Sequence, residues 1–129
     1  MTEPKRIRAR IAIAIHDEAI YEFGGLAGIR EHGLLESALD RPRNLLAYKP
    51  RSSIFELAAA VCFGVAKNHP FNDGNKRTAL LSTRAFLYLN GRVLEPLQPD
   101  EVATMLAVAA DALNEKQLAV WLRLNSRRA

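Results

Sequence analysis

Residues 69–79 of the 129-residue chain read HPFNDGNKRTA, a polar stretch between two apolar segments that both have helical spacing. Before it, apolar residues within 54–65 recur at i, i+3, i+4 and i+7, which is typical of an amphipathic helix. After it, residues 79–89 (ALLSTRAFLYL) are apolar nearly all round, which predicts a central, buried helix. Pro70 and the run Asn72-Asp73-Gly74 between the two are turn residues. The stretch therefore predicts a helix–loop–helix unit whose second helix starts as this run ends.

The rest of the chain also favours helices. The segment IAIAI (11–15) alternates like a strand, but its alanines and the following HDEAIYEF favour a helix that ends at Gly24-Gly25. A shorter helix is expected over 34–39, with an interruption at Pro42. Two further helices are expected, one starting near Pro99 and one around Trp121, which we interpret as a core residue. About six helices and no clear sheet predict an all-α fold, and the length fits one domain over 1–129.

Composition and charge limit the classes of function. Apolar residues make up 49% and charged residues 25% of the chain, as in soluble globular proteins. No apolar run approaches the ~20 residues of a membrane span, and the N-terminus lacks a secretory signal pattern. The single cysteine, Cys62, is interpreted as a small buried thiol in a reducing cytoplasm. The net charge of +4 gathers at the two ends. We interpret it as solvated termini rather than as a nucleic-acid surface.

The start of the second helix is predicted to bind phosphates. Lys76 and Arg77 face the positive end of the helix dipole, which costs about 0.3–1 kcal/mol per charge when no anion is present. A phosphate reverses this effect, because the free N–H groups of the first turn and both cations then donate hydrogen bonds to it. Gly74, Asn75, Lys76 and Arg77 are therefore the expected cradle for a polyphosphate.

The residues just before the cradle fit a transfer reaction. Asp73 offers carboxylate oxygens beside the phosphates, where Mg²⁺ is usually held by one or two carboxylates and phosphate oxygens. His69 belongs to a residue type that titrates near pH ~6.5, which suits a general base for an attacking hydroxyl. Phe71 is expected to anchor the loop in the core. Each residue alone would fit an ordinary helix–loop–helix corner with a solvated Lys-Arg pair, but their joint spacing favours phosphoryl-type transfer.

The stretch closely resembles the signature of the Fic/Doc family, His-x-Phe-x-Asp/Glu-Gly/Ala-Asn-Gly/Lys-Arg, and specifically its Doc (death-on-curing) branch. The segment GGLAGIREHGLLESAL (24–39) is also similar to that branch, so the resemblance covers nearly the whole chain. It implies a helical fold with the motif loop leading into a central helix. It also implies His69 as general base, Asp73 as Mg²⁺ ligand and residues 74–77 as phosphate binders. The loop at 48–53 falls where the family has a flap that aligns the target segment.

Two positions separate this chain from the adenylyl-transferring branch, whose motif resembles HxFx(D/E)GNGRxxR. Lys76 replaces the second Gly of that motif and occupies space that a phosphate fills there, while Leu80 replaces the last Arg and removes one clamp. The Doc branch is similar in both respects. The resemblance implies a toxin that moves the terminal phosphate of ATP, with Mg²⁺, onto a Ser/Thr hydroxyl of a translation elongation factor. A nucleotidyl (AMP) transferase of the same fold is the alternative. A non-enzymatic module that binds nucleic acid or an antitoxin fits the His69–Asp73 pair less well.

Regulation is expected from a separate protein. The inhibitory motif Ser/Thr-x-x-x-Glu-Gly/Asn of the adenylyl transferases is not found, since the matching spacing from Ser52 to Glu56 is followed by Leu57. The resemblance therefore implies a cognate antitoxin that covers the site, and the basic ends could dock an acidic partner. His16 and His32 lack ligand-like neighbours in the sequence and are expected to be structural or at the surface. For Arg84, contact with the site and pairing with a buried acid are both open.

Overall fold

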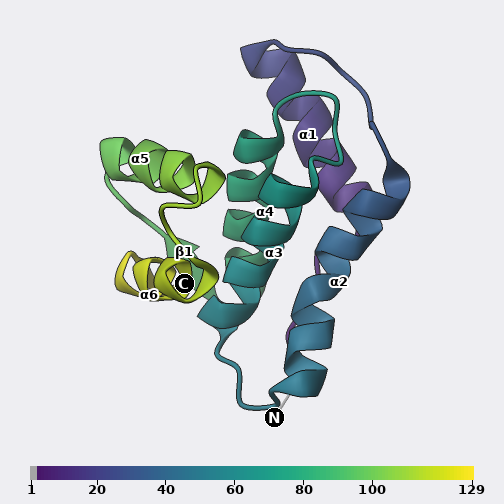
Figure 1. The fold of residues 1–129 in the computed structure, drawn as a ribbon. Helices are drawn as coiled ribbons and strands as arrows, with labels where there is room; N and C mark the ends of the chain where they lie inside the picture. Colours follow the sequence, from purple (N-terminus) through teal and green to yellow (C-terminus); the bar gives the residue numbers. More distant parts are fainter. Residues whose placement is uncertain (1–2) are drawn as a thin grey trace.

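A computed structural model describes residues 3–129 (Figure 1). Within them the chain forms six helices and two short strands, in this order: α1 (Ala9–Phe23), α2 (His32–Tyr48), α3 (Ile54–Asn68), α4 (Asn75–Leu89), β1 (Arg92–Leu94), α5 (Gln98–Ala109), α6 (Glu115–Leu124) and β2 (Ser126–Arg128). The predicted predominance of helices is confirmed, including a helix over the ambiguous segment 11–15.

A small two-stranded sheet accompanies the predicted helices. Strands β1 and β2 pair antiparallel, with Val93 opposite Arg127. Gly91 adopts the left-handed conformation with φ of 83° and turns the chain out of α4 into β1. Strands of three residues are too short for an alternating pattern to be visible, and their pairing joins segments far apart in the sequence.

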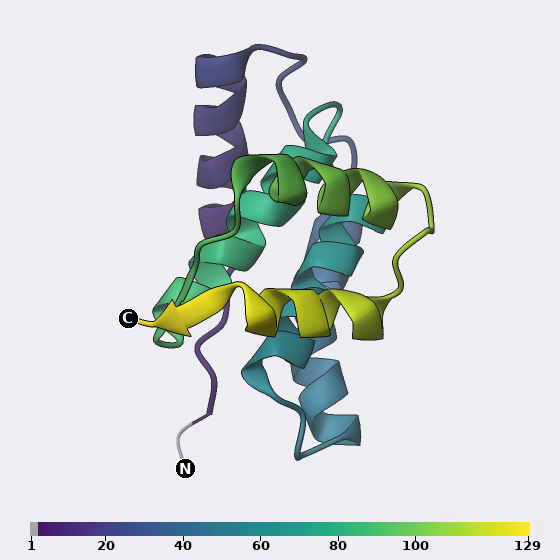
Figure 2. The same ribbon diagram turned by 90° about the vertical axis from the view of Figure 1, so that its left-hand side faces the viewer.

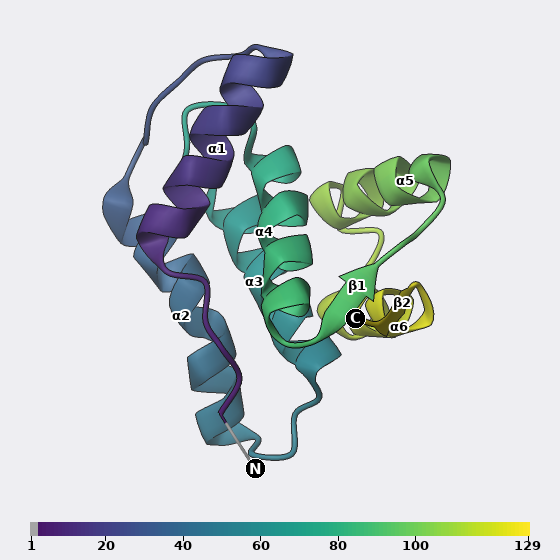
Figure 3. The same cartoon turned by 180° about the vertical axis from the view of Figure 1, so that it is seen from behind.

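Helix α3 is the centre of the molecule and packs against α2, α4, α5 and α6. Figures 1 and 3 show α5 and α6 on one side of it and α1 and α2 on the other, and in Figure 2 α5 and α6 lie in front. The buried helix predicted over 79–89 is α4, but Tyr88 and Leu89 on it are exposed. The more central position belongs to α3 because its small residues let neighbouring helices approach closely on several sides.

The predicted interruption at Pro42 is wrong, since α2 continues through it to Tyr48. A proline inside a helix removes the hydrogen bond to the carbonyl four residues earlier, here that of Ala38. Packing compensates at this point. Gly64 of α3 approaches so closely that a Cβ there would lie 2.8 Å from Ala38 Cα and 2.9 Å from the Ala38 carbonyl oxygen. Pro42 itself is buried.

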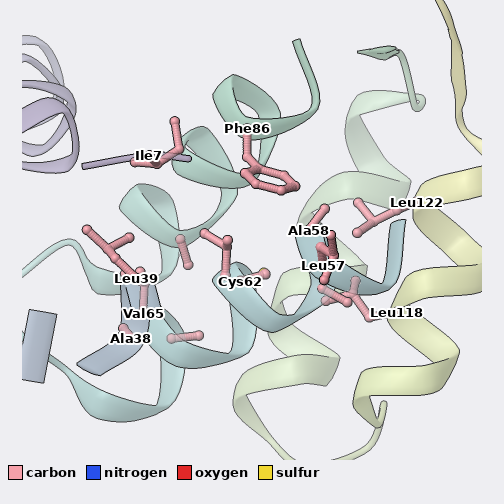
Figure 4. Close-up of a cluster of buried hydrophobic side chains, with 14 of the residues drawn as sticks. Ile7, Ala38, Leu39, Leu57, Ala58, Cys62, Val65, Phe86, Leu118 and Leu122 are labelled. Carbon is pink, nitrogen blue, oxygen red and sulfur yellow. The ribbon is translucent and has the colours of Figure 1, made fainter. Parts of the chain in front are cut away.

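The core lies between α3 and its neighbours (Figure 4). It draws on all the helices, and its largest side chains include Phe71, Phe86, Leu57 and Leu118. Burial raises the pKa of the Cys62 thiol to about 12, as expected for a small buried thiol. Trp121 is half-buried and packs against this core.

Some of the basic excess at the chain ends is bound to the protein's own acids. Arg6 pairs with Asp40 at 2.8 Å, and Arg127 pairs with Glu95 at 2.9 Å. Among residues 3–129, no helix has both the length and the hydropathy required to cross a bilayer.

Candidate active site

The motif loop lies at one end of the molecule, where α3 ends and α4 begins (Figure 1). The connection between α1 and α2, residues 24–31, runs beside it. Ile29 forms an isolated antiparallel bridge with Phe71, and the Asn72 N–H donates to the Gly28 carbonyl at 3.1 Å. The two segments therefore form one structural unit.

The loop at 48–53, expected to be the flap, is at the other end of α3, so that expectation is wrong (Figures 1 and 3). Helices α2 and α3 are antiparallel, and the connection between them must lie a helix length of about 22 Å from the motif. There Ser53 and Glu56 form the capping box of α3. The segment beside the motif is 24–31, and its glycines with positive φ at Gly24, Gly25 and Gly28 are the sequence signal for an unusual backbone path.

His69 is the residue that ends α3, and it adopts the left-handed conformation with φ of 49° and ψ of 56°. Its side chain is exposed. In the described part of the chain no group hydrogen-bonds the imidazole ring, while the backbone carbonyl of His69 accepts from Arg30 Nε at 2.8 Å. The ring can therefore accept a proton from a hydroxyl that approaches from solvent.

Asp73 is held as a charged carboxylate beside the start of α4. Its Oδ2 accepts from the Leu26 N–H at 3.0 Å and its Oδ1 from the Gly74 N–H at 2.8 Å. These two hydrogen bonds are the main cause of its lowered pKa, with smaller contributions from His16 and Arg77. Gly25 permits the approach, because a Cβ there would lie 2.9 Å from Asp73 Oδ2. Each oxygen still has acceptor capacity for a cation.

His16 of α1 packs against the buried side of the motif loop, a role that the sequence did not indicate. Its ring is 1% exposed and stacks on Phe71, with centroids 3.9 Å apart and planes 6° apart. Nε2 lies 2.7 Å from the Asp73 carbonyl oxygen, so this nitrogen carries the hydrogen and donates it. The expectation of a structural histidine is confirmed, but its partners come from the motif. His32 is exposed at the start of α2.

The first turn of α4 has no side-chain cap, and Gly74 enters it with φ of 72°. The first backbone N–H groups of a helix have no acceptor within the helix, so they can bind an anion here. Asn75 is buried, and its side chain spans the loop to the Phe71 N–H (3.0 Å) and carbonyl (2.9 Å). Its side chain is thereby engaged with the loop, and its backbone N–H is left for a phosphate.

The two cations of the predicted cradle are both exposed at this end of α4. The guanidinium of Arg77 lies 4.2 Å from the centre of the Phe23 ring. Both residues border a groove of about 460 Å³ between α4 and α5, which Leu80 also lines. Arg84 is not part of this cradle, since it donates to the Leu94 carbonyl and pairs with the largely buried Glu101.

The donor set at Asp73 fits a cation that arrives with phosphates. Residues 3–129 contain no group of three or more His, Cys, Asp or Glu side chains that could hold a metal ion. A metal at Asp73 would therefore need oxygens from phosphate and water, which is the coordination that Mg²⁺ favours.

The motif and its surroundings match known proteins. The model of the Fic/DOC family matches residues 6–87. The chain is 38% identical over 98 residues to "Protein kinase doc" of Escherichia phage P1, covering 76% of each chain. It is 42% identical over 73 residues to "Toxin Doc" of Mycolicibacterium smegmatis, covering 54% of each. From the loop geometry and these relatives together, the chain belongs to the Fic/DOC family and to its Doc branch.

Proposed function

We propose that the protein is the toxin of a toxin–antitoxin pair and transfers the terminal phosphate of ATP to a Ser/Thr hydroxyl of a translation elongation factor. The names of its relatives, a protein kinase and a toxin, support this class of activity. The observation that carries the proposal is the pairing of an unbonded His69 ring with an ionised Asp73 beside an uncapped helix N-terminus. Simple binding of a partner requires no such pairing.

In the proposed reaction the hydroxyl oxygen of the target bonds to the γ-phosphorus, and the bond from that phosphorus to the oxygen bridging it to ADP breaks. An imidazole nitrogen of His69 takes the hydroxyl proton. The N–H groups at the start of α4, Lys76 and Arg77 hold the phosphate oxygens and stabilise their charge. Mg²⁺, bound through Asp73, would add charge neutralisation. Segment 24–31 takes over the role of aligning the target segment, because it lies beside the motif.

The choice between a kinase and a nucleotidyl transferase rests on two positions. Lys76 is exposed at the start of α4 and carries a long cationic side chain where the adenylyl-transferring motif has Gly. Leu80 lines the groove beside it and supplies an apolar surface in place of a phosphate clamp. Both changes favour a nucleotide position that differs from that in the adenylyl-transferring branch and that brings the γ-phosphate to His69. AMP transfer to a protein hydroxyl is the second candidate, because the His69–Asp73 pair would serve it equally.

Control by a separate antitoxin follows from the same proposal. The spacing from Ser52 to Glu56 lies far from the motif: Glu56 is engaged with Ser53 in the cap of α3, and the Ser52 hydroxyl donates to the Lys49 carbonyl at 2.8 Å, so this pair does not act as an inhibitory segment. We infer that a cognate antitoxin covers the site and that the toxin acts on translation in the cytoplasm.

A labelling experiment tests the proposed reaction. The protein is incubated with Mg²⁺, a bacterial lysate or purified elongation factor, and ATP labelled at either the α or the γ phosphate. We expect label on the factor from γ-ATP alone, loss of that label in His69→Ala, and no loss in the exposed control His32→Ala. Transfer from α-ATP would replace the kinase by the nucleotidyl transferase. Arrest of growth by His69→Ala at the wild-type level would refute both enzymes.

A further inference from the structure

Arg30 lies outside the motif, yet its guanidinium reaches the C-terminal end of α3. Its Nε donates to the His69 carbonyl at 2.8 Å, and its Nη2 donates to the Asn68 carbonyl at 2.9 Å. The backbone N–H groups of Arg30 and Glu31 both donate to the Pro70 carbonyl, at 2.8 and 3.1 Å. Two adjacent residues of segment 24–31 thus hold three consecutive carbonyls around His69.

These contacts bear directly on the torsions of His69. Its φ sets the orientation of the peptide plane that carries the Asn68 carbonyl, and its ψ sets the plane that carries its own carbonyl. A rigid, planar guanidinium bonded to both oxygens therefore restrains both angles at once. The restraint matters because His69 has a backbone φ of 49°, and residues other than glycine rarely adopt such a positive φ.

We propose that Arg30 is a positioning residue that locks His69 in the left-handed conformation and so aims its imidazole at the reacting hydroxyl. The direction of the Cβ, and with it the reach of the ring, follows from those two torsions. A cation is also favourable at this place, because the last carbonyls of α3 form the negative end of its dipole. Since the inference assumes that His69 is the general base, it rests on the proposed function.

The kinetic test compares Arg30→Ala, Arg30→Gln and Arg30→Lys with Arg51→Ala, an exposed arginine at the opposite end of α3. We expect Arg30→Ala to lower kcat by roughly 10²-fold, the loss typical of a misplaced catalytic group. KM for ATP should stay within about twofold, because the cradle on α4 does not contact Arg30. Arg30→Lys should recover little of the rate, since an ammonium lacks the guanidinium fork.

Added guanidinium ion at low millimolar concentration should restore part of the rate of Arg30→Ala and none of that of His69→Ala. A raised KM with unchanged kcat would overturn the assignment.

A second measurement does not depend on the reaction. NMR chemical shifts and the amide–Hα coupling of His69 report its φ, and we expect the wild-type protein and Arg51→Ala to show the left-handed values. In Arg30→Ala and Arg30→Gln these signals should move toward the averaged values of a mobile residue, while the melting temperature stays high enough for the assay. Unchanged His69 signals in both variants would refute the lock, whatever the activity. If the wild-type protein transfers no phosphate, the proposed function fails and this measurement still decides the role of Arg30.

Discussion

Substitution of His16 tests how the motif loop is supported. In the structure this buried ring makes two contacts with the loop, a stack on Phe71 at 3.9 Å and a hydrogen bond from Nε2 to the Asp73 carbonyl at 2.7 Å. His16→Phe keeps the ring and removes the donor, whereas His16→Ala removes both contacts and leaves a cavity. The two variants therefore separate the hydrogen bond from the stack.

The expected magnitudes follow from these contacts. Loss of the hydrogen bond should cost about 1 kcal/mol of the free energy of unfolding, because the carbonyl belongs to a loop residue that water can reach. Loss of the stack adds about 0.5–1.5 kcal/mol, and the cavity left by a large-to-small change adds further. We therefore expect His16→Phe to be destabilised by about 1 kcal/mol and His16→Ala by about 3 kcal/mol.

Urea unfolding at neutral pH measures these changes, with the exposed His32→Phe as the control. The same proteins are assayed for phosphate transfer, where displacement of Asp73 should reduce activity even in the mildly destabilised His16→Phe. Equal stability of His16→Phe and wild type, with full activity, would refute the role of the hydrogen bond. A His16→Ala variant no less stable than His16→Phe would show that the stack contributes nothing.

Three further outcomes are expected. Gly64→Ala should lose about 1–3 kcal/mol in the same urea experiment, because its Cβ would lie 2.8 Å from Ala38 Cα. The control is Gly33→Ala, whose Cβ meets only a side-chain atom at 3.9 Å, and equal losses in the two would contradict the close approach. The lowered pKa of Asp73 means that its stabilising contribution is complete above the ordinary aspartate pKa of about 3.9 and is lost as pH falls through the lower folded value. Asp73→Asn should therefore flatten the acid side of a stability–pH curve, and an unchanged slope would contradict the hydrogen-bonded carboxylate. Cys62, with a pKa of about 12, should resist iodoacetamide at pH ~8 until urea unfolds the protein, and rapid labelling of the native state would contradict its burial.

The parts of the fold that were predictable depend on local patterns. The apolar spacing over 54–65 and 79–89 falls within α3 and α4, and the turn residues around Asp73 predicted the start of α4 at Asn75. The continuation of α2 through Pro42 was not predictable from the sequence, because it depends on packing against Gly64 of α3. The position of the loop at 48–53 depends on α2 and α3 being antiparallel, which the sequence of that loop does not encode.

The candidate site shows the same division. His69, Asp73 and the start of α4 are adjacent in sequence, so their common location was foreseeable. His16 and Arg30 contact the motif from 57 and 39 positions away, and no local spacing reveals such contacts. Asn75 lies in the first turn of α4 as expected, but its side chain closes the loop by bonding to the Phe71 backbone, which its place in the sequence does not reveal.

The reversal of direction between α3 and α4 gives the site a built-in electric polarity. His69 ends a helix whose last carbonyls carry about half a negative charge, and Gly74 opens one whose first N–H groups carry about half a positive charge. In the proposed reaction, the proton that His69 accepts and the phosphate that α4 binds are therefore stabilised on opposite sides of the same short loop. This field belongs to the peptide backbone, so it persists when Lys76 or Arg77 is replaced. We expect such variants to keep the negative backbone potential at His69 and the positive one at the start of α4, because side-chain substitution does not remove the backbone dipoles.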